Sequence, residues 1–255
     1  MSEHVIILGA TSRIAAGVAE AELLGGAHVY LVARDQNELR VVASDLEFRT
    51  GRAVGVVGFP TLDAAGLDAW SSWLSTLPAV HRCYSLIGSE APHSGHLADD
   101  VREALAANVV DPLRVIEPVL EHMGAGGALV VVSSVAQLVP RPDVLAYGAA
   151  KSALSFALQS MMRSERYADR RIIEVRLGWV DTRMSIGRTV PGLTIGPREA
   201  GTRLAHCART GAGVRYVPGW WRLLAVLAPP GNAAIAFRAA IRRRFHRLPG
   251  ANGVR

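Results

Sequence analysis

Short apolar runs alternate along the chain with longer segments in which apolar residues recur at a helical period. The apolar runs cover residues 4–8, 28–33, 53–57, 83–87, 128–132 and 172–177, and they are rich in valine and isoleucine. Nearly continuous hydrophobicity over such short lengths indicates strands that are buried on both faces. A seventh short strand is expected at 214–217.

Helical patterns fill the intervals between these runs. They cover residues 12–24, 36–50, 63–76, 98–123 and 145–167. Pro112 and Pro118 are expected to bend or break the fourth helix. Strands that alternate with helices in this way predict a doubly wound α/β fold of the Rossmann type, with a mostly parallel seven-stranded sheet and helices on both faces.

The chain divides into one large unit and a short C-terminal arm. We expect a catalytic domain over residues 1–218, because no low-complexity linker divides residues 1–200. Within it, residues 178–198 are rich in glycine and lack a clear period, which predicts a loop over the mouth of the site. Residues 219–255 form a basic and aromatic, amphipathic arm.

Charge and cysteine content narrow the class of protein. The formal net charge is +6, but residues 200–255 hold ten arginines and no acidic residue, whereas residues 1–199 are net acidic. The two cysteines are too few for a disulfide framework, and the first residues show no signal-peptide pattern. A reducing, cytoplasmic compartment is therefore expected, with peripheral contact to the cytoplasmic membrane face as the open alternative.

The end of the first apolar run is a candidate phosphate site. It reads Gly9-Ala10-Thr11-Ser12-Arg13-Ile14, and a helical pattern follows at once. A small-residue turn between a strand and a helix points backbone N–H groups at a phosphate, and the helix dipole favours the negative charge. An ordinary tight turn would show the same pattern, but the first crossover of an α/β sheet is where dinucleotides bind.

The second apolar run ends at Arg34 and Asp35, which bear on the choice of cofactor. An acid at this position usually holds the ribose of NAD, whereas a basic group suits the 2′-phosphate of NADP. Arg34 therefore favours NADP(H) over NAD(H), and Arg13 adds to the same positive charge. Asp35 keeps NAD open, and a solvated loop arginine is the alternative interpretation of Arg34.

Three residues form a candidate catalytic set. Tyr147 and Lys151 are four residues apart and fall on one helical face, and Ser134 ends the strand that lies thirteen residues before the tyrosine. Lys151 is the only lysine of the chain, against 27 arginines. A nearby ammonium is expected to lower the pKa of a tyrosine into the range that proton transfer near neutrality requires.

These motifs resemble those of the short-chain dehydrogenases/reductases, from residue 4 to about 185. The likeness is carried by the segments ILGATSRIA, LAANVVDPL, VVVSSVAQ, YGAAK and VRLGWVDTRM. It implies an NAD(P)(H)-dependent oxidoreductase in which Tyr147 is the proton donor and acceptor, Lys151 lowers its pKa and holds the nicotinamide ribose, and Ser134 positions the substrate carbonyl. Asn108 would support a water-linked proton relay. The cofactor would lie against Gly9, Thr11, Ser12, Arg13, Ile14, Arg34, Gly88, Tyr147, Lys151 and Thr182.

The sequence also departs from the family pattern. Arg13 and Ala15 replace the second and third glycines of the phosphate turn, and the motif after the fourth strand is reduced to residues 86–89. The acid usual after the third strand is missing, and Leu177 stands where the family often has proline. These changes bear on cofactor affinity and leave the catalytic set intact. A non-catalytic dinucleotide-binding scaffold is the rival from another class of protein.

The C-terminal arm leaves two interpretations open. Its paired tryptophans, short apolar stretches and arginine run suit a membrane interface with anionic lipid, but residues 220–228 are too few to span a bilayer. The arm could equally pack on the domain or on a second subunit. One basic run with few aromatics does not make a nucleic-acid platform, so no nucleic acid is expected.

The nature of the substrate and partners rests on resemblance. Residues 182–185 and 245–249 resemble the reductase half of the decaprenylphosphoryl-ribose 2′-epimerase system, which implies a lipid-linked keto sugar as substrate. A soluble steroid, acyl or small alcohol substrate is the alternative. The family likeness also implies a homodimer or homotetramer. His93 and His96 match no zinc spacing, so no metal is expected.

Overall fold

A single parallel sheet organises the protein. The computed structural model describes residues 3–90, 94–183 and 192–227. In these ranges seven strands are arranged in the order β3-β2-β1-β4-β5-β6-β7, and all neighbours are parallel. They are β1 (His4–Leu8), β2 (His28–Ala33), β3 (Val54–Gly58), β4 (Val80–Ser85), β5 (Met123–Ser134), β6 (Arg171–Leu177) and β7 (Gly213–Val217). The predicted doubly wound Rossmann-type fold is confirmed.

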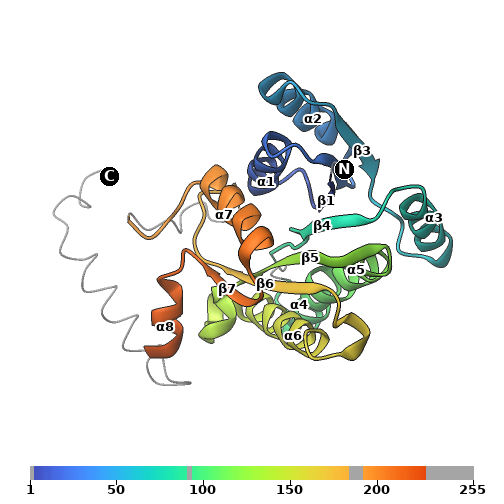
Figure 1. The fold of residues 1–255 in the computed structure, drawn as a ribbon. Coiled ribbons are helices and arrows are strands. Elements are labelled where there is room, and N and C mark those ends of the chain that lie inside the picture. Colours follow the sequence, from blue (N-terminus) through green and yellow to red (C-terminus); the bar gives the residue numbers. More distant parts are fainter. Residues whose placement is uncertain (1–2, 91–93, 184–191, 228–255) are drawn as a thin grey trace, which may run out of the picture.

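Helices cover both faces of this sheet (Figure 1). One face carries α1 (Arg13–Leu24), α2 (Gln36–Thr50) and α7 (Pro197–Thr210). The other carries α3 (Ala64–Ser75), α5 (Asp111–Glu121) and α6 (Leu145–Met161), and α4 (Leu97–Leu105) packs beside α6. A short helix, α8 (Trp221–Leu227), follows β7. Because both faces are covered, the central strands are apolar on both sides, as their sequences predict.

Side-chain caps define where the first three helices begin. Ser12, Asp35 and Asp63 each accept backbone N–H groups of the first turn of α1, α2 and α3. Such caps satisfy donors that have no partner within the helix. The same residues therefore set where each crossover leaves the carboxyl edge of the sheet.

The predicted fourth helix is a continuous run of helical residues that contains a π-helical turn. It comprises α4, the π-helical turn η1 (Ala106–Val110) and α5, which follow one another without a gap. Pro112 directly follows the π-helical turn, and Pro118 lies inside α5; neither ends the helix. The last predicted helix is too long, because α6 ends at Met161 and a 3₁₀ turn, η4 (Glu165–Tyr167), follows.

Two further differences concern α7 and β4. The sequence pattern does not predict α7, because its buried face consists largely of alanine and glycine. Small residues let it approach α1 closely: a Cβ on Gly201 would lie 2.5 Å from the carbonyl carbon of Gly17. Strand β4 begins and ends earlier than expected, so Leu86 and Ile87 leave the sheet and line a cavity at its carboxyl edge.

Candidate active site

The turn between β1 and α1 forms one end of this cavity. Gly9 has a φ of +75°, and a Cβ there would lie 3.0 Å from the carbonyl group of Leu86, so both its conformation and its surroundings require glycine. The Ser12 hydroxyl accepts the N–H of Ile14 at 3.2 Å. The turn residues that line the cavity are Thr11, Ser12, Arg13 and Ile14. A helix N-terminus with an arginine beside it favours an anion.

The cavity extends from this turn to the start of α6. Its volume is about 450 Å³, and its lining comes from the carboxyl ends of the central strands and the loops after them. The carboxyl ends of the strands are where ligands bind in open α/β sheets. Of the predicted site residues, the structure brings together at this cavity Thr11, Ser12, Arg13, Ile14, Gly88, Ser134, Tyr147, Lys151 and Thr182.

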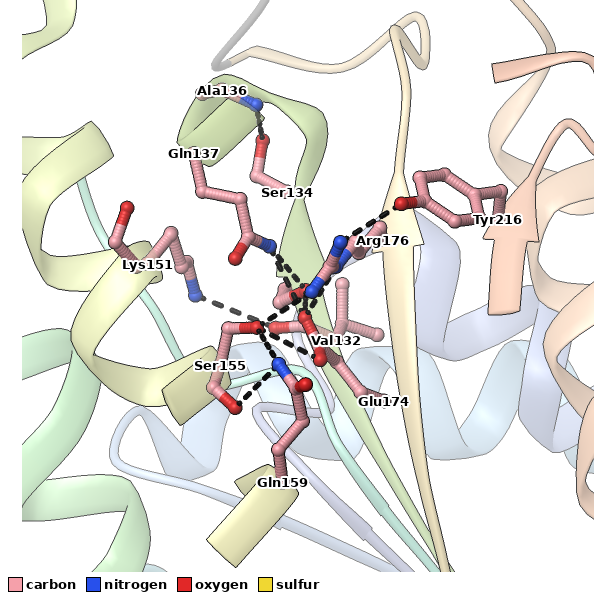
Figure 2. A network of polar contacts seen from close by, with 12 residues as sticks. Val132, Ser134, Ala136, Gln137, Lys151, Ser155, Gln159, Glu174, Arg176 and Tyr216 are labelled. Atoms are coloured by element: carbon pink, nitrogen blue, oxygen red, sulfur yellow. Dashed lines mark hydrogen bonds and ion pairs between the residues drawn. The ribbon is translucent and has the colours of Figure 1, made fainter. Parts of the chain in front are cut away.

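Ser134, Tyr147 and Lys151 converge from two elements. Ser134 is the last residue of β5, and the other two lie in the first two turns of α6. A side-chain hydrogen bond joins Ser134 to Tyr147. The Ser134 oxygen also accepts the N–H of Ala136 at 3.1 Å, which fixes the serine rotamer at the start of the 3₁₀ turn η2 (Val135–Leu138), as Figure 2 shows.

Burial has the largest effect on the pKa values of Tyr147 and Lys151. Burial raises the pKa of Tyr147 to about 12, the hydrogen bond with Ser134 opposes this, and the negative charge of Glu90 adds to it. Burial also lowers the pKa of Lys151 to about 8. The sequence led us to expect that Lys151 would lower the pKa of Tyr147. In this structure desolvation has the larger effect, because it disfavours the charged form of both groups.

Asn108 lies behind the cavity wall. It is fully buried in the π-helical turn, and its Nδ2 donates to the carbonyl groups of Ser89 and Ala104, both at 3.0 Å. Gly88 separates it from the cavity: a Cβ there would lie 2.8 Å from the Asn108 Oδ1 and 3.0 Å from the Lys151 Nζ. Asn108 therefore positions the chain after β4 and does not itself line the cavity.

After β2, the structure does not bring Arg34 to the cavity lining. Arg34 is exposed after β2. The Asp35 carboxylate accepts the N–H groups of Asn37 and Glu38, both at 3.0 Å, and so caps α2. Glu38 lines the cavity, although the sequence pattern did not single it out. Glu38 lies in the first helical turn after the second strand, and this position is the feature of the sequence that could have indicated it as a site residue.

Further residues of the cavity wall were not singled out from the sequence. They include Glu90, Ala136, Arg141, Val144, Trp179 and Arg183. Trp179 belongs to the predicted loop at 178–198, in which Val180 and Ile195 form a parallel bridge and residues 184–191 lie outside the described ranges. The Trp179 ring meets that of Trp221 edge to face, with 5.4 Å between centres. The first turn of α8 thus supports the cavity wall.

The donors of the cavity fit a nicotinamide dinucleotide. One end offers a helix N-terminus and Arg13 to phosphates. At the other end, the hydrogen bond that Lys151 Nζ makes among the described residues is a long one, 3.4 Å to the carbonyl of Val132. An ammonium has three donors, so Lys151 retains donors for ribose hydroxyls.

Neither a metal cluster nor a membrane-spanning helix occurs in the described ranges. No group of three or more His, Cys, Asp or Glu side chains there is placed to hold a metal ion. No helix in that part of the chain is long and apolar enough to cross a bilayer. His93 lies outside the described residues.

Comparison with known proteins identifies the family. The sequence model of the family described as short chain dehydrogenase matches residues 3–189, which is most of the chain and includes the turn, Ser134, Tyr147 and Lys151. The chain belongs to the short-chain dehydrogenase/reductase family. It is accordingly an oxidoreductase of a family that binds nicotinamide dinucleotides.

Relatives of this short-chain dehydrogenase/reductase agree with the match. The chain is 30% identical over 233 residues to the uncharacterized oxidoreductase Rv2073c of Mycobacterium tuberculosis strain H37Rv, covering 86% of this chain and 89% of the relative. A short-chain dehydrogenase/reductase from Mycobacterium ulcerans has a similar fold, with a TM-score of 0.70, 20% identity and 85% and 90% coverage of the two chains. BdcA in complex with NADPH has a TM-score of 0.68, 21% identity and coverage of 84% and 92%.

Proposed function

We propose that this protein is an NADP(H)-dependent reductase that converts a ketone to a secondary alcohol. The observation that carries the proposal is the convergence of Ser134, Tyr147 and Lys151 on a cavity whose other end is a phosphate-binding turn. A binding scaffold would need the turn but would have no use for a buried ammonium beside a half-buried phenol at the cavity.

Each of the three side chains has a distinct task in this proposal. The Ser134 hydroxyl, which bonds to Tyr147 in the free protein, donates to the substrate carbonyl. Tyr147 delivers its proton to the oxygen as negative charge develops there. Lys151 holds ribose hydroxyls, and its charge favours the phenolate that remains. The bound nicotinamide supplies the hydride for the carbonyl carbon.

The test of this mechanism is Tyr147→Phe. The variant is expected to lose turnover of a ketone panel with NADPH, while the NADPH dissociation constant, measured by nicotinamide fluorescence, stays within about two-fold. Tyr167→Phe, a half-buried tyrosine outside the cavity lining, is the matched control and should retain turnover. Retained turnover in Tyr147→Phe would overturn the mechanism. NADPH binding by the wild type without turnover of any ketone would instead favour the scaffold.

The preference for NADP(H) is supported by three observations. Arg13 lines the cavity at the turn, Arg34 follows β2, and the Asp35 carboxylate is engaged in capping α2. The similar BdcA is described in complex with NADPH. Titration with NADPH and NADH at matched ionic strength tests the preference: NADPH should bind more tightly, and Arg34→Ala should reduce the difference. Equal affinities, or tighter NADH binding, would contradict it.

The lipid-linked substrate is supported by the surface of α8. This helix exposes Leu223 and Val226 beside the exposed Arg222, next to the tryptophans that support the cavity wall. An apolar and basic surface of this kind suits an anionic membrane from which a keto sugar would be presented. A soluble ketone remains the second candidate, because Trp221 packs on the domain.

Vesicle sedimentation separates the two candidates. The wild type should sediment with phosphatidylglycerol vesicles more than with phosphatidylcholine vesicles, and Leu223→Glu/Val226→Glu should reduce binding. Val41→Glu/Phe48→Glu, which alters equally exposed apolar residues on α2, is the control. No difference between wild type and the α8 variant would favour the soluble substrate.

The proposed homodimer or homotetramer is supported by α6. Phe156 is 77% exposed on this helix, and Leu145 and Val110 are exposed nearby. Light scattering after gel filtration should report a mass that is a multiple of 27.2 kDa. A monomer at micromolar concentration would contradict the proposal.

A further inference from the structure

Glu174 is a fully buried carboxylate in the middle of an otherwise apolar strand. It lies in β6 between Ile173 and Val175, and its exposed fraction is 0%. A buried carboxylate is costly unless it is paired and hydrogen-bonded. Replacing a buried ion pair by well-packed apolar residues is often neutral or stabilising, so stability alone gives a poor account of this residue.

The carboxylate accepts four hydrogen bonds (Figure 2). Its Oε1 accepts from the Ser133 hydroxyl at 2.7 Å, from Gln137 Nε2 at 3.1 Å and from Arg176 Nε at 2.9 Å. Its Oε2 accepts from the Ser155 hydroxyl at 2.9 Å. Both oxygens are therefore satisfied by donors from several different elements.

Two of these donors flank Ser134. Ser133 precedes it directly, and Gln137 follows it in η2, the turn that the Ser134 oxygen caps. Gln137 Nε2 also donates to the Ser133 hydroxyl at 3.0 Å. The residues on both sides of Ser134 are thus tied to one oxygen of Glu174.

A third donor lies on the helix that carries Tyr147 and Lys151. Ser155 is one helical turn after Lys151 in α6 and is buried. Arg176 Nη2 donates to the Ser155 oxygen at 2.9 Å, and Gln159 Nε2 donates to it at 3.0 Å. One carboxylate therefore connects the strand end that carries Ser134 to the helix that carries its two partners.

Arg176 extends the same network to the edge of the sheet. Its Nη1 donates to the Tyr216 hydroxyl of β7 at 2.8 Å, and its guanidinium lies 5.5 Å from the centre of that ring. Figure 2 shows the arginine between Glu174 and Tyr216. The network thus spans β5, β6, β7 and α6, and it fixes their carboxyl-edge spacing with directional contacts.

We propose that Glu174 is a positioning residue, which sets the distance between β5 and α6 and so aligns Ser134 with Tyr147 and Lys151. This inference rests on the proposed function for the reaction it serves. Because geometry at the reacting atoms governs rate, a small misplacement of Ser134 relative to Tyr147 lowers kcat more than it affects binding of the dinucleotide.

The primary test is Glu174→Gln, which keeps the shape of the side chain and removes its charge. With NADPH and the ketone that the wild type reduces fastest, kcat is expected to fall roughly 100-fold, while the KM for NADPH stays within about two-fold. An unchanged kcat would overturn the proposal. A KM that rises as kcat falls would also overturn it, because this would indicate general loss of the cavity.

Glu22→Gln is the matched control. Glu22 is also fully buried and bonded to arginines, Arg82 and Arg209, and to Tyr84, but it lies near the end of α1, away from the cavity. Both variants should lose thermal stability, and only Glu174→Gln should lose kcat at temperatures where both are folded. An equal loss of kcat in Glu22→Gln would show that destabilisation alone accounts for the effect.

Ser155→Ala is the gentler variant if Glu174→Gln does not fold. It removes the α6 anchor and leaves the Glu174–Arg176 pair in place, so kcat should fall about 10-fold. Ser160→Ala on the same helix, where the hydroxyl donates to the carbonyl of Phe156 on the surface, should leave kcat unchanged. Equal rates in the two serine variants would contradict the proposal.

A readout without substrate keeps this inference separate from the proposed function. Lys151 is the sole lysine, so ¹³Cε-labelled lysine gives one NMR signal from the site. The signal should move in Glu174→Gln and Ser155→Ala and stay in place in Glu22→Gln and Ser160→Ala. If the wild type reduced no ketone, the proposed function would fail, while a displaced signal would still support the positioning. An unmoved signal in Glu174→Gln would overturn the positioning.

Discussion

The ammonium of Lys151 lies 5.7 Å from the centre of the Tyr147 ring; the lysine is buried, and the tyrosine is half-buried in the cavity wall. At this separation the cation faces the ring of the tyrosine and does not bond to its hydroxyl. In the free protein, burial therefore controls both pKa values. Ligand hydroxyls that bind to Lys151 would stabilise its ammonium form, whose charge favours the phenolate that remains after Tyr147 gives up its proton.

The first prediction concerns the titration of Lys151. Burial lowers its pKa to about 8 from 10.5. The ¹³Cε signal of the sole lysine should therefore titrate near pH 8 in the free protein. A midpoint near 10.5 would show that water reaches the amine freely and would contradict its burial.

A second prediction rests on the same desolvation. Because the folded pKa is lower than the unfolded one, the unfolded chain binds more protons between pH 8 and 10.5, so this group raises stability as pH increases through that interval. Near pH 7 the buried charge is a cost. Lys151→Met should therefore raise the unfolding free energy of the free protein by about 2 kcal/mol while abolishing turnover. Urea denaturation measures the gain, and destabilisation of the variant would refute it.

A third prediction concerns Glu38 and cofactor affinity. This carboxylate lines the cavity beside the turn that would hold phosphates. Its negative charge opposes a dinucleotide phosphate, so Glu38→Gln should tighten NADPH binding roughly three-fold. Glu103→Gln, an exposed glutamate on α4 outside the lining, is the control and should have no effect. Weaker NADPH binding in Glu38→Gln would show that the carboxylate contacts the cofactor favourably.

A fourth prediction concerns the histidines at the amino ends of β1, β2 and β4. His4 stacks between His28 and His81, with ring centres at 5.2 and 6.3 Å. Burial and the charges of these two neighbours lower the pKa of His4 below 6.5. The unfolded chain then binds more protons as pH falls through about 6.5, so stability is lost on acidification.

His4→Phe isolates this contribution. It keeps the stacking and removes the titrating ring, so the loss of unfolding free energy between about pH 7.5 and about pH 5.5 should be smaller than in the wild type. Urea denaturation at the two pH values provides the comparison. Parallel losses in the two proteins would place the acid sensitivity elsewhere in the chain.

A fifth prediction concerns the support of the cavity wall. A Cβ on Gly178 would overlap the indole of Trp221. Gly178→Ala should therefore displace Trp221 and, through it, Trp179, which changes tryptophan fluorescence and raises the KM for the ketone. Adding Trp221→Ala should restore room for the methyl group. An unaltered KM and spectrum in Gly178→Ala would show that α8 does not support the wall.

Most of the fold could be predicted because its signals are local. Continuous valine and isoleucine runs mark strands covered on both faces, and caps such as Ser12 and Asp35 mark where helices begin. Helix α7 lacked such a signal. Its contact with α1 depends on Gly201 and on alanines. Such small residues give only a weak hydrophobic pattern in the sequence, even where the backbones of two helices are in contact.

The sequence indicated the site residues whose positions follow from a local pattern. It did not indicate those that reach the cavity from separate segments. Tyr147 and Lys151 are linked by helical spacing, and Ser134 by the end of a strand. Glu38, Trp179 and Arg141 reach the cavity from separate segments, whose course no periodicity reveals. The sequence did contain an indication of the network around Glu174, because a carboxylate inside an apolar strand requires buried partners. Two of its partners, however, lie 37 and 41 residues away along the chain, at Gln137 and Ser133.

The glycine contact between α1 and α7 has a consequence for how this chain can vary. The family model matches residues 3–189 and α7 lies beyond that match, yet the backbone of Gly201 rests on that of Gly17, in the helix whose first turn faces the cavity. The phosphate turn therefore depends on packing by a helix outside the residues that the family model matches. Any replacement of α7 must offer α1 an equally bare helix surface, because a larger side chain at residue 201 would displace the helix that begins at the phosphate turn.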